Sequence, residues 1–299
     1  MISVIICSAD AGELEKVKEN IAATIGVPYE IISSDNSDGR KGICEVYNNG
    51  VAQAKYETLC FMHEDIEMKT ENWGRKVIEI FDQDSEIGLI GIAGGGYKSL
   101  TPSGWYNYHL EENGGFYCNL IQGYKYAEKP DKLDYRNPNN ALSSGVACID
   151  GCWFCTRKKA ALQYPFDQNL LKKFHGYDLD FSLAISQSYK AVVTFEVLLK
   201  HFSEGKFDKV WMDEVLKVHK KWAELLPVNK AGLAENRLKQ IERNALEHFM
   251  QQSLNTGYYT KAELAMMVWR TRESRIATLS FPFKLWKKLY KMKRQTDIF

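Results

Sequence analysis

Three consecutive side chains that can bind protons or metal ions follow a short apolar run in the first third of the chain. His63, Glu64 and Asp65 come directly after residues 59–62, in the stretch ETLCFMHEDIEM. A hard divalent cation prefers carboxylate oxygens and water, and Mn²⁺ also accepts an imidazole nitrogen. The stretch therefore predicts a site for Mn²⁺ or Mg²⁺, with Glu64 solvating the edge of the site. The alternative is an ordinary strand that ends in polar residues at the surface.

Strand and helix patterns alternate ahead of and after this stretch. Apolar, β-branched runs predict strands at 2–7, 29–33, 58–62 and 87–93, with helices beginning near residues 10, 43 and 73. This order predicts an α/β fold, a mostly parallel sheet with helices on both faces. Because such sheets bind ligands at the carboxyl ends of their strands, Asp35, Asp65 and Asp178 are expected at one edge. Each aspartate taken singly is also a common turn or cap residue.

The rest of the chain changes character twice. Residues 97–140 lose all periodicity and predict a long loop or an irregular hairpin, either a lid or a structural insert. Strands are expected at 146–156 and 191–198. Beyond about residue 205 the sequence is almost entirely helical and increasingly basic. We therefore expect one α/β domain over residues 1–205 and a helical, basic C-terminal region over residues 206–299.

The order and spacing of several stretches match the pattern of one known family. ISVIIC, YEIISSDNSDG and YNNGVAQAKYETLCFMHEDIEM are followed by IDGCWFCTRKKAAL and PFDQNLLKKFHGYDLDFSLAISQSYKAVV. Together they resemble a family 2 glycosyltransferase with the Rossmann-like GT-A fold, most of all the streptomycin-biosynthesis-type branch. The resemblance covers residues 1–205. It implies that this domain binds a nucleotide sugar with its first half and an acceptor with its second.

The resemblance also implies roles for particular residues on the nucleotide side. Asp35 would hydrogen bond the nucleobase, uracil in the implied UDP-sugar, and Asn48 would lie beside the nucleotide. Asp65 would bind the metal that bridges the diphosphate, and His201 would complete the metal shell. His63 would contact ribose or metal, and it stands where the family has an acidic residue. A neutral imidazole attracts a dication less than a carboxylate does, so this departure bears on metal affinity.

On the acceptor side, the resemblance implies that Asp178 is the general base. Asp180 is counted among the substrate-binding residues and is a rival for the base, and Tyr177 replaces the Glu that the family has before its Asp. A diphosphate leaving group needs a cation or fixed dipoles, and a hydroxyl nucleophile needs a carboxylate to take its proton. A single base opposite the leaving group implies metal-assisted transfer with inversion.

Other functions remain as alternatives at this stage. A non-catalytic nucleotide-sugar-binding or scaffolding module with the same fold would fit the departures at His63 and Tyr177. A nucleotidyltransferase would need a Gly-rich phosphate loop after the first strand, where CSADAGELEK stands. Cysteines 148, 152 and 155 have the spacing of an iron–sulfur radical enzyme, but they lie in a predicted strand that leads into a helix, where buried core thiols are the favoured interpretation.

Composition limits the partners and the compartment. Lys plus Arg total 39 against 38 for Asp plus Glu, and a neutral balance does not support nucleic-acid binding. Seven cysteines without small-domain spacing fit free thiols in a reducing compartment. The first residues predict a strand rather than a signal peptide. These features predict a cytoplasmic protein, and the family resemblance implies a bacterial one with a glycan or lipid-linked hydroxyl acceptor.

The C-terminal segment 281–294 alternates aromatic and basic residues, in FPFKLWKKLYKMKR. This pattern is typical of an interfacial helix on anionic lipid, and it predicts peripheral contact with the inner face of a membrane. A solvated basic helix packed on the domain is the alternative.

Overall fold

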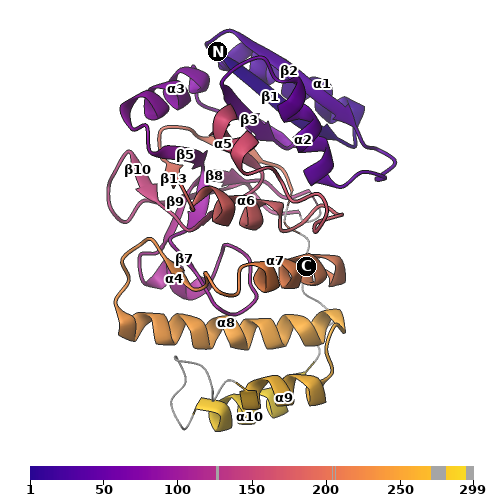
Figure 1. Ribbon diagram of the computed structural model, residues 1–299, viewed down its shortest axis with the longest axis vertical. Helices are drawn as coiled ribbons and strands as arrows, with labels where there is room; N and C mark the ends of the chain where they lie inside the picture. The colour runs from indigo at the N-terminus through magenta and orange to yellow at the C-terminus, as the bar shows by residue number, and fades with distance from the viewer. Residues whose placement is uncertain (126–127, 204, 206, 271–280, 294–299) are drawn as a thin grey trace.

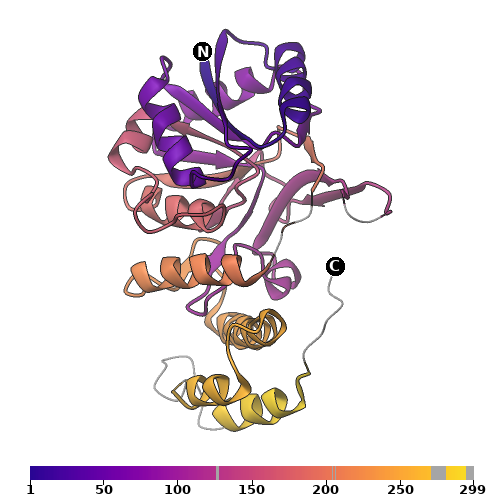
Figure 2. The ribbon, with the colours of Figure 1, turned by 90° about the vertical axis from the view of Figure 1, so that its right-hand side faces the viewer.

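The computed structural model describes the whole chain except residues 126–127, 204, 206, 271–280 and 294–299. A large sheet with its helices occupies one end of the molecule, and the C-terminal helices are stacked at the other end (Figure 1). The view turned by 90° shows the same separation (Figure 2). The predicted α/β domain followed by a helical region is therefore confirmed.

The large sheet has seven strands in the order β10-β13-β5-β12-β3-β1-β2. Five of them, β1, β2, β3, β5 and β13, run in one direction, and β12 and β10 run against them. The strands are β1 Ile2–Ser8, β2 Tyr29–Asp35, β3 Thr58–Met62, β5 Ile87–Gly91, β10 Ser143–Gly145, β12 Trp153–Arg157 and β13 Lys190–Thr194. The prediction of a mostly parallel sheet is thus confirmed.

Helices cover both faces of this sheet, which explains why its central strands are apolar throughout. Alternate residues of β1 point to opposite sides: Ile5 packs with α2, α5 and α6, whereas Val4 and Ile6 pack with α1 and α3. Asp10 caps α1 by accepting the backbone N–H groups of its first turn at 2.8 and 3.1 Å. The helices are α1 Ala11–Thr24, α2 Ile43–Gln53, α3 Trp73–Gln83, α5 Lys158–Gln163 and α6 Tyr177–Ile185.

A second sheet of six strands was not predicted from the sequence. Its order is β11-β6-β8-β14-β4, with β9 paired to β8, and its apolar residues join the core beneath α1 and α3. Residues 97–140 contribute β8 and β9 to this sheet and also form the short α4, so part of the segment is a structural insert. The elements are β4 Ile66–Met68, β6 Ala93–Gly95, β8 Phe116–Gln122, β9 Lys132–Arg136, β11 Cys148–Ile149, β14 Leu199–His201 and α4 Tyr108–Glu112.

Three predicted strands are shorter than expected because the chain changes sheet within them. The run 146–156 divides into β11 and β12 at Asp150, whose backbone N–H binds Ala93 O at 2.8 Å and whose side chain accepts Cys152 N at 2.7 Å. The runs 87–93 and 191–198 likewise end early and continue into the second sheet as β6 and β14. Periodicity alone does not show such a change of sheet, although the Asp150-Gly151 pair is a turn-type dipeptide.

The C-terminal region is helical, as predicted. It contains α7 Lys209–Lys221, α8 Glu235–Thr256, α9 Lys261–Arg270 and α10 Phe281–Lys291, with a short β15 Val228–Asn229 paired to β7 Tyr97–Lys98. Glu242 of α8 accepts Tyr97 Oη at 2.6 Å and Leu100 N at 2.7 Å, so this region is bonded to the first. None of the helices in the described residues is both long and apolar enough to span a bilayer. The boundary near residue 205 stays a prediction.

Candidate metal and catalytic site

Asp65 and His201 are brought together by the pairing of β4 with β14. The register places His201 opposite Ile66, and Phe202 N donates to Asp65 O at 3.0 Å. His201 Nε2 consequently lies 3.5 Å from Asp65 Oδ1. His63, which follows β3, places its Nδ1 3.9 Å from the same oxygen. Asp65 and His201, which the resemblance assigns to the metal, and His63, which it assigns to ribose or metal, are therefore neighbours.

These three side chains have the arrangement of a cation site. Their ligand atoms all lie within 4.8 Å of one another, and within the described part of the chain no other group of three His, Cys, Asp or Glu residues meets this condition. At metal–ligand distances of about 2.1 Å, two ligands of one ion are separated by about 3–4 Å. Two imidazole nitrogens and one carboxylate oxygen suit Mn²⁺ better than Mg²⁺, which prefers oxygen alone.

The protonation states of His63 and Asp65 favour a bound cation. Burial lowers the pKa of His63 to about 4, helped by the neighbouring His201 and opposed by Asp65 and Asp150. Burial alone would raise the pKa of Asp65, but its hydrogen bond to His201 and its electrostatic interaction with the two histidines hold that pKa below its usual range. At neutral pH the site thus presents a neutral His63 and an ionised Asp65, which are the forms that bind metal.

Asp178 lies at the start of α6, next to Tyr177, whose hydroxyl is 2.8 Å from His63 Nε2. Burial raises the pKa of the Asp178 carboxyl to about 7, and the like charge of Asp150 adds to this rise. Its Oδ1 accepts the backbone N–H of Leu179 at 2.9 Å. A carboxylate with a pKa near 7 is suited to accept a proton at neutral pH.

Asp150 belongs to this site, and the sequence analysis missed it. Its negative charge raises the pKa of both His63 and Asp178, so it lies within electrostatic reach of the metal side and of the base. The one available signal was its place directly after the apolar ACI segment, because other polar residues of the site also follow apolar runs.

Asp180 faces a different part of the molecule. It is 2% exposed, its carboxylate is 2.8 Å from Lys221 Nζ, and Trp222 Nε1 donates to it at 2.7 Å. Both donors come from the end of α7, so the described contacts of Asp180 join α6 to α7. These contacts give Asp180 a structural role and weaken its standing as a rival for the base.

Asp35 and Asn48, the residues expected near the nucleotide, lie in different settings. Asp35 ends β2 opposite Ser8, at the edge where β3 also ends, and its exposed carboxylate accepts Ser37 N at 2.9 Å. Asn48, on α2, binds the backbone of Phe166 in both directions, with its amide donating at 2.9 Å and its carbonyl accepting at 3.1 Å. Contact of either residue with a nucleotide stays a prediction.

Glu64 does more than solvate the edge of the site. Its carboxylate accepts the backbone N–H groups of Ala9 and Asp10 at 3.0 and 3.1 Å. These contacts fasten the loop between β1 and α1 to the end of β3. The expectation that Glu64 only solvates the edge was therefore wrong, since carboxylates bind exposed backbone donors at strand and helix ends.

The cysteines do not form the alternative iron–sulfur site. Cys148, Cys152 and Cys155 are all buried and free, and they do not meet the distance condition for a metal group in the part of the chain that the structure describes. Burial raises the pKa of each of the three thiols, which favours the neutral thiol over the thiolate that binds iron. They are core residues of β11, β12 and the turn between them.

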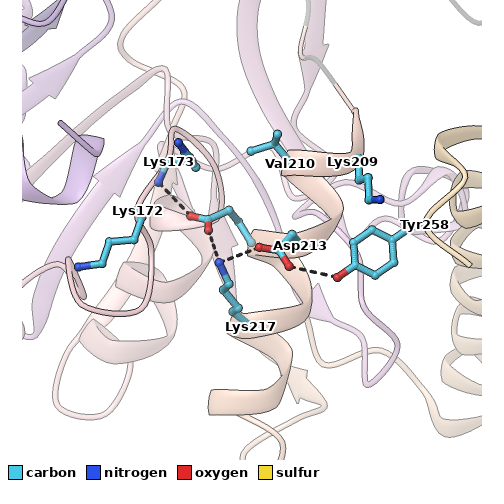
Figure 3. Close-up of a pocket in the computed structure, with 8 residues that line it drawn as sticks. Lys172, Lys173, Lys209, Val210, Asp213, Lys217 and Tyr258 are labelled. Atoms are coloured by element: carbon cyan, nitrogen blue, oxygen red, sulfur yellow. Dashed lines mark hydrogen bonds and ion pairs between the residues drawn. The ribbon is translucent and has the colours of Figure 1, made fainter. Parts of the chain in front are cut away.

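A hollow of about 520 Å³ lies beside the loop that precedes α6 (Figure 3). Lys172 and Lys173 of that loop line it, together with residues of α7 and Tyr258. Both of its acidic residues are already bonded: Asp213 to Lys217 at 2.7 Å and to Tyr258 Oη at 3.1 Å, and Glu214 to Lys217 at 2.8 Å. The next loop residue, Phe174, instead packs its ring 5.4 Å from that of His63, so the loop separates this hollow from the metal-type cluster.

A mostly parallel α/β sheet with a histidine–aspartate metal site at its edge is typical of enzymes that transfer groups from nucleotide-activated donors. Residues 3–224 match the family described as "Glycosyltransferase like family". Because this match spans most of the chain, the protein belongs to that family. No curated protein sequence matches this chain.

The solved structures that this chain resembles include GalNAc-T7 and TarS. GalNAc-T7, determined with UDP, GalNAc and Mn²⁺, is 12% identical over 86% of this chain and 56% of its own, with a TM-score of 0.49. TarS of S. aureus is 13% identical over 89% of this chain and 48% of its own, with a TM-score of 0.46. The chain thus matches about half the length of each, and at these identities the likeness concerns the fold alone.

Proposed function

We propose that this glycosyltransferase moves a sugar from a nucleotide sugar of the UDP type to a hydroxyl acceptor, with inversion and with Asp178 as the general base. The observation that carries the proposal is that the His63–Asp65–His201 cluster and Asp178 are linked through Tyr177 and share Asp150 as a charged neighbour. Tyr177 links the two parts, because its hydroxyl contacts His63 and its backbone precedes Asp178. One site thereby holds the groups that a leaving diphosphate and an attacking hydroxyl each require.

The reaction divides between the two parts of this site. A cation held by Asp65, His201 and His63 would supply positive charge to the diphosphate as it leaves. Asp178 takes the proton of the acceptor hydroxyl while that oxygen bonds to the anomeric carbon. The bond from this carbon to the diphosphate oxygen breaks, and its electron pair leaves with the nucleoside diphosphate. Attack opposite the leaving group inverts the anomeric configuration.

The remaining site residues support the nucleotide in this proposal. Asp35 lies at the sheet edge where a nucleobase would contact the end of β2, and Asn48 fixes the neighbouring α2. Glu64 holds the β1–α1 loop in place on the same edge. Asp180 contributes to acceptor binding only indirectly, because it anchors the helix α6.

A thermal-shift panel of UDP-, dTDP- and GDP-sugars, each with and without Mn²⁺, tests the proposal. A ligand that binds only the folded state raises its apparent melting temperature. We expect a UDP-sugar with Mn²⁺ to give the largest shift and to release UDP over time. The absence of a shift with every nucleotide sugar would contradict the proposal. A shift without any turnover would instead support the non-catalytic binding module.

We further propose that the acceptor is presented at an anionic membrane surface, and that α9 and α10 bind there. Phe283, Trp286 and Tyr290 of α10 are 60%, 40% and 87% exposed, although Leu285 and Leu289 of the same helix are buried in the core. Aromatic side chains left outside the core and interleaved with lysines are typical of a helix at a lipid interface. Residue 294, the last of the predicted segment, lies outside the described residues.

Helix α9 extends this face. Its Met266 and Trp269 are 63% and 40% exposed. Trp269 stacks on Trp286 of α10 with ring centres 5.6 Å apart, and Trp286 Nε1 donates to Ala265 O at 2.9 Å. The aromatic face therefore spans both helices, which a single packed basic helix would not explain.

Co-sedimentation of the full chain with phosphatidylglycerol vesicles tests the membrane contact. Lys284→Glu with Lys287→Glu should weaken binding about tenfold or more, because each juxtamembrane lysine contributes about 1 kcal/mol. Lys159→Glu with Lys220→Glu makes the same charge change at exposed positions elsewhere and should bind like the unchanged protein. Equal binding by all three proteins would contradict the membrane proposal.

A further inference from the structure

The two residues that depart from the family pattern touch one another. His63 stands where an acidic residue is expected, and Tyr177 stands where a Glu is expected. The structure places His63 Nε2 2.8 Å from Tyr177 Oη, a hydrogen bond between residues 114 positions apart. Two residues that had each lost a function independently would have no reason to form a hydrogen bond with one another. The contact indicates instead that His63 and Tyr177 act together.

The direction of this hydrogen bond follows from a second one. Tyr177 Oη also lies 3.0 Å from the backbone oxygen of Gly151, which can only accept. The single hydroxyl proton of Tyr177 therefore goes to Gly151, and the hydroxyl oxygen accepts a proton from His63. His63 must then carry its hydrogen on Nε2, which leaves the lone pair on Nδ1.

That lone pair is the one that faces the cation site. His63 Nδ1 is the ring nitrogen nearest Asp65, at 3.9 Å from Oδ1. This distance exceeds a hydrogen bond, so the opposite tautomer, with Nδ1–H, would gain no good acceptor in Asp65. In that tautomer Tyr177 would have to donate its hydroxyl proton to His63 Nε2. The backbone oxygen of Gly151 would then lose its hydrogen bond from Tyr177. Only the Nε2–H tautomer satisfies every group in this chain of contacts.

The surroundings hold the chain of contacts rigidly. Gly151 has no side chain, and a Cβ there would lie 2.3 Å from Tyr177 Oη, so only glycine permits the approach. His63 N donates to Cys152 O at 2.9 Å, which ties its backbone to the same turn. The ring of Phe174 packs 5.4 Å from His63 and 6.2 Å from Tyr177.

We propose that Tyr177 is a positioning residue that fixes His63 in the Nε2–H tautomer and so turns the Nδ1 lone pair toward the cation. Metal-binding histidines generally donate their other ring N–H to a fixed acceptor, and loss of that acceptor weakens metal affinity about 10–100-fold. The proposal rests on the proposed function only for the presence of the cation. The tautomer itself is a property of the metal-free protein.

Histidine side-chain ¹⁵N–¹H correlation spectra of the metal-free full chain at pH 8 test the tautomer. The chain has six histidines, and the His63 signal is assigned by its loss in His63→Gln. We expect His63 to be protonated at Nε2 in the unchanged protein and to become a mixture of tautomers in Tyr177→Phe. Tyr164→Phe, which removes a hydroxyl bonded to Ser188 instead, should leave the His63 signal unchanged.

A titration of Mn²⁺ followed by electron paramagnetic resonance gives the second readout. Tyr177→Phe should bind Mn²⁺ at least tenfold more weakly, and Tyr164→Phe should match the unchanged protein. Protonation of His63 at Nδ1, or a tautomer that Tyr177→Phe leaves unaltered, would overturn the proposal. If the unchanged protein binds no Mn²⁺ yet shows the expected tautomers, the metal part of the proposed function fails while the role of Tyr177 is supported.

Discussion

Asp178 and Asp180 lie two residues apart on the first turn of α6, and burial raises the pKa of both carboxyls, yet their charged neighbours differ in sign. Asp180 is the more deeply buried of the two, and Lys221 and Trp222 satisfy its charge. Asp178 has Asp150 as a charged neighbour, and the opposing effect of Lys98 on its pKa is smaller. A buried carboxylate beside a cation forms an ion pair that stabilises the fold. A buried carboxylate beside a like charge has its pKa raised further, as a general base requires.

The largest expected effect separates the two residues by activity. Asp178→Asn should lower the rate of nucleoside diphosphate release by about 10³-fold, because the amide cannot accept the acceptor proton. Binding of the nucleotide sugar, measured as a thermal shift, should be retained. A rate within a few-fold of the unchanged protein would show that Asp178 is not the base.

The second prediction removes the cation beside Asp180, so that Asp180, like Asp178, becomes a buried carboxyl without a close cationic partner. Lys221→Met removes the cation beside Asp180 and should lower the free energy of unfolding by about 2–4 kcal/mol at pH 8. Burial raises the pKa of Asp180 and Lys221 opposes that rise, so without the lysine the carboxyl takes up a proton more readily. The loss should therefore shrink towards pH 5. Urea unfolding at both pH values measures it, and an equal loss at both would contradict the comparison.

A smaller effect is expected when Asp180 itself is changed. Asp180→Asn keeps an acceptor for Trp222, and Lys221 keeps its ion pair with Asp167 at 2.9 Å. The free energy of unfolding should fall by about 1–2 kcal/mol, with turnover reduced far less than in Asp178→Asn. Urea unfolding and nucleotide release are measured together. A loss of turnover as large as that of Asp178→Asn would restore Asp180 as the base.

The smallest effect is a change of stability with pH. Because the folded protein raises the pKa of Asp178 to about 7 from an ordinary value of 3.8, it binds a proton between these pH values that the unfolded chain releases. The contribution of the Asp178 carboxyl to the free energy of unfolding is thus present below about pH 4 and is lost as the pH rises towards 7. The melting temperature of metal-free Asp178→Asn relative to the unchanged protein should rise by about 2 °C or more from pH 4 to pH 8. A constant difference would contradict the raised pKa.

Much of the fold could be predicted because it depends on local patterns. The strand over residues 58–62 has the predicted bounds, and the helices predicted near residues 10, 43 and 73 begin at residues 11, 43 and 73, since turn signals and periodicity define these ends. The change of sheet at Asp150 could not be predicted from periodicity, because residues 146–156 are apolar on both sides of the Asp150-Gly151 pair and the partner strands are distant in sequence. Only strand pairing, not periodicity, decides where such a run divides.

In the site, likewise, some contacts could be predicted from the sequence and others could not. The meeting of Asp65 with His201 was expected from the family resemblance and agrees with the pairing of β4 with β14. The contact of His63 with Tyr177 was not expected, because each residue had been considered only as a departure at its own position. The structure links them through the turn at Gly151, a contact that no single stretch of sequence contains.

The most direct test of the central claim is the release of UDP from a UDP-sugar by the full chain at pH 8, with EDTA and then with added Mn²⁺. The account predicts release that EDTA stops and Mn²⁺ restores, with Mg²⁺ restoring it less because two of the three ligands are imidazoles. Release at the same rate in EDTA would contradict the assignment of His63, Asp65 and His201 as a catalytic metal site.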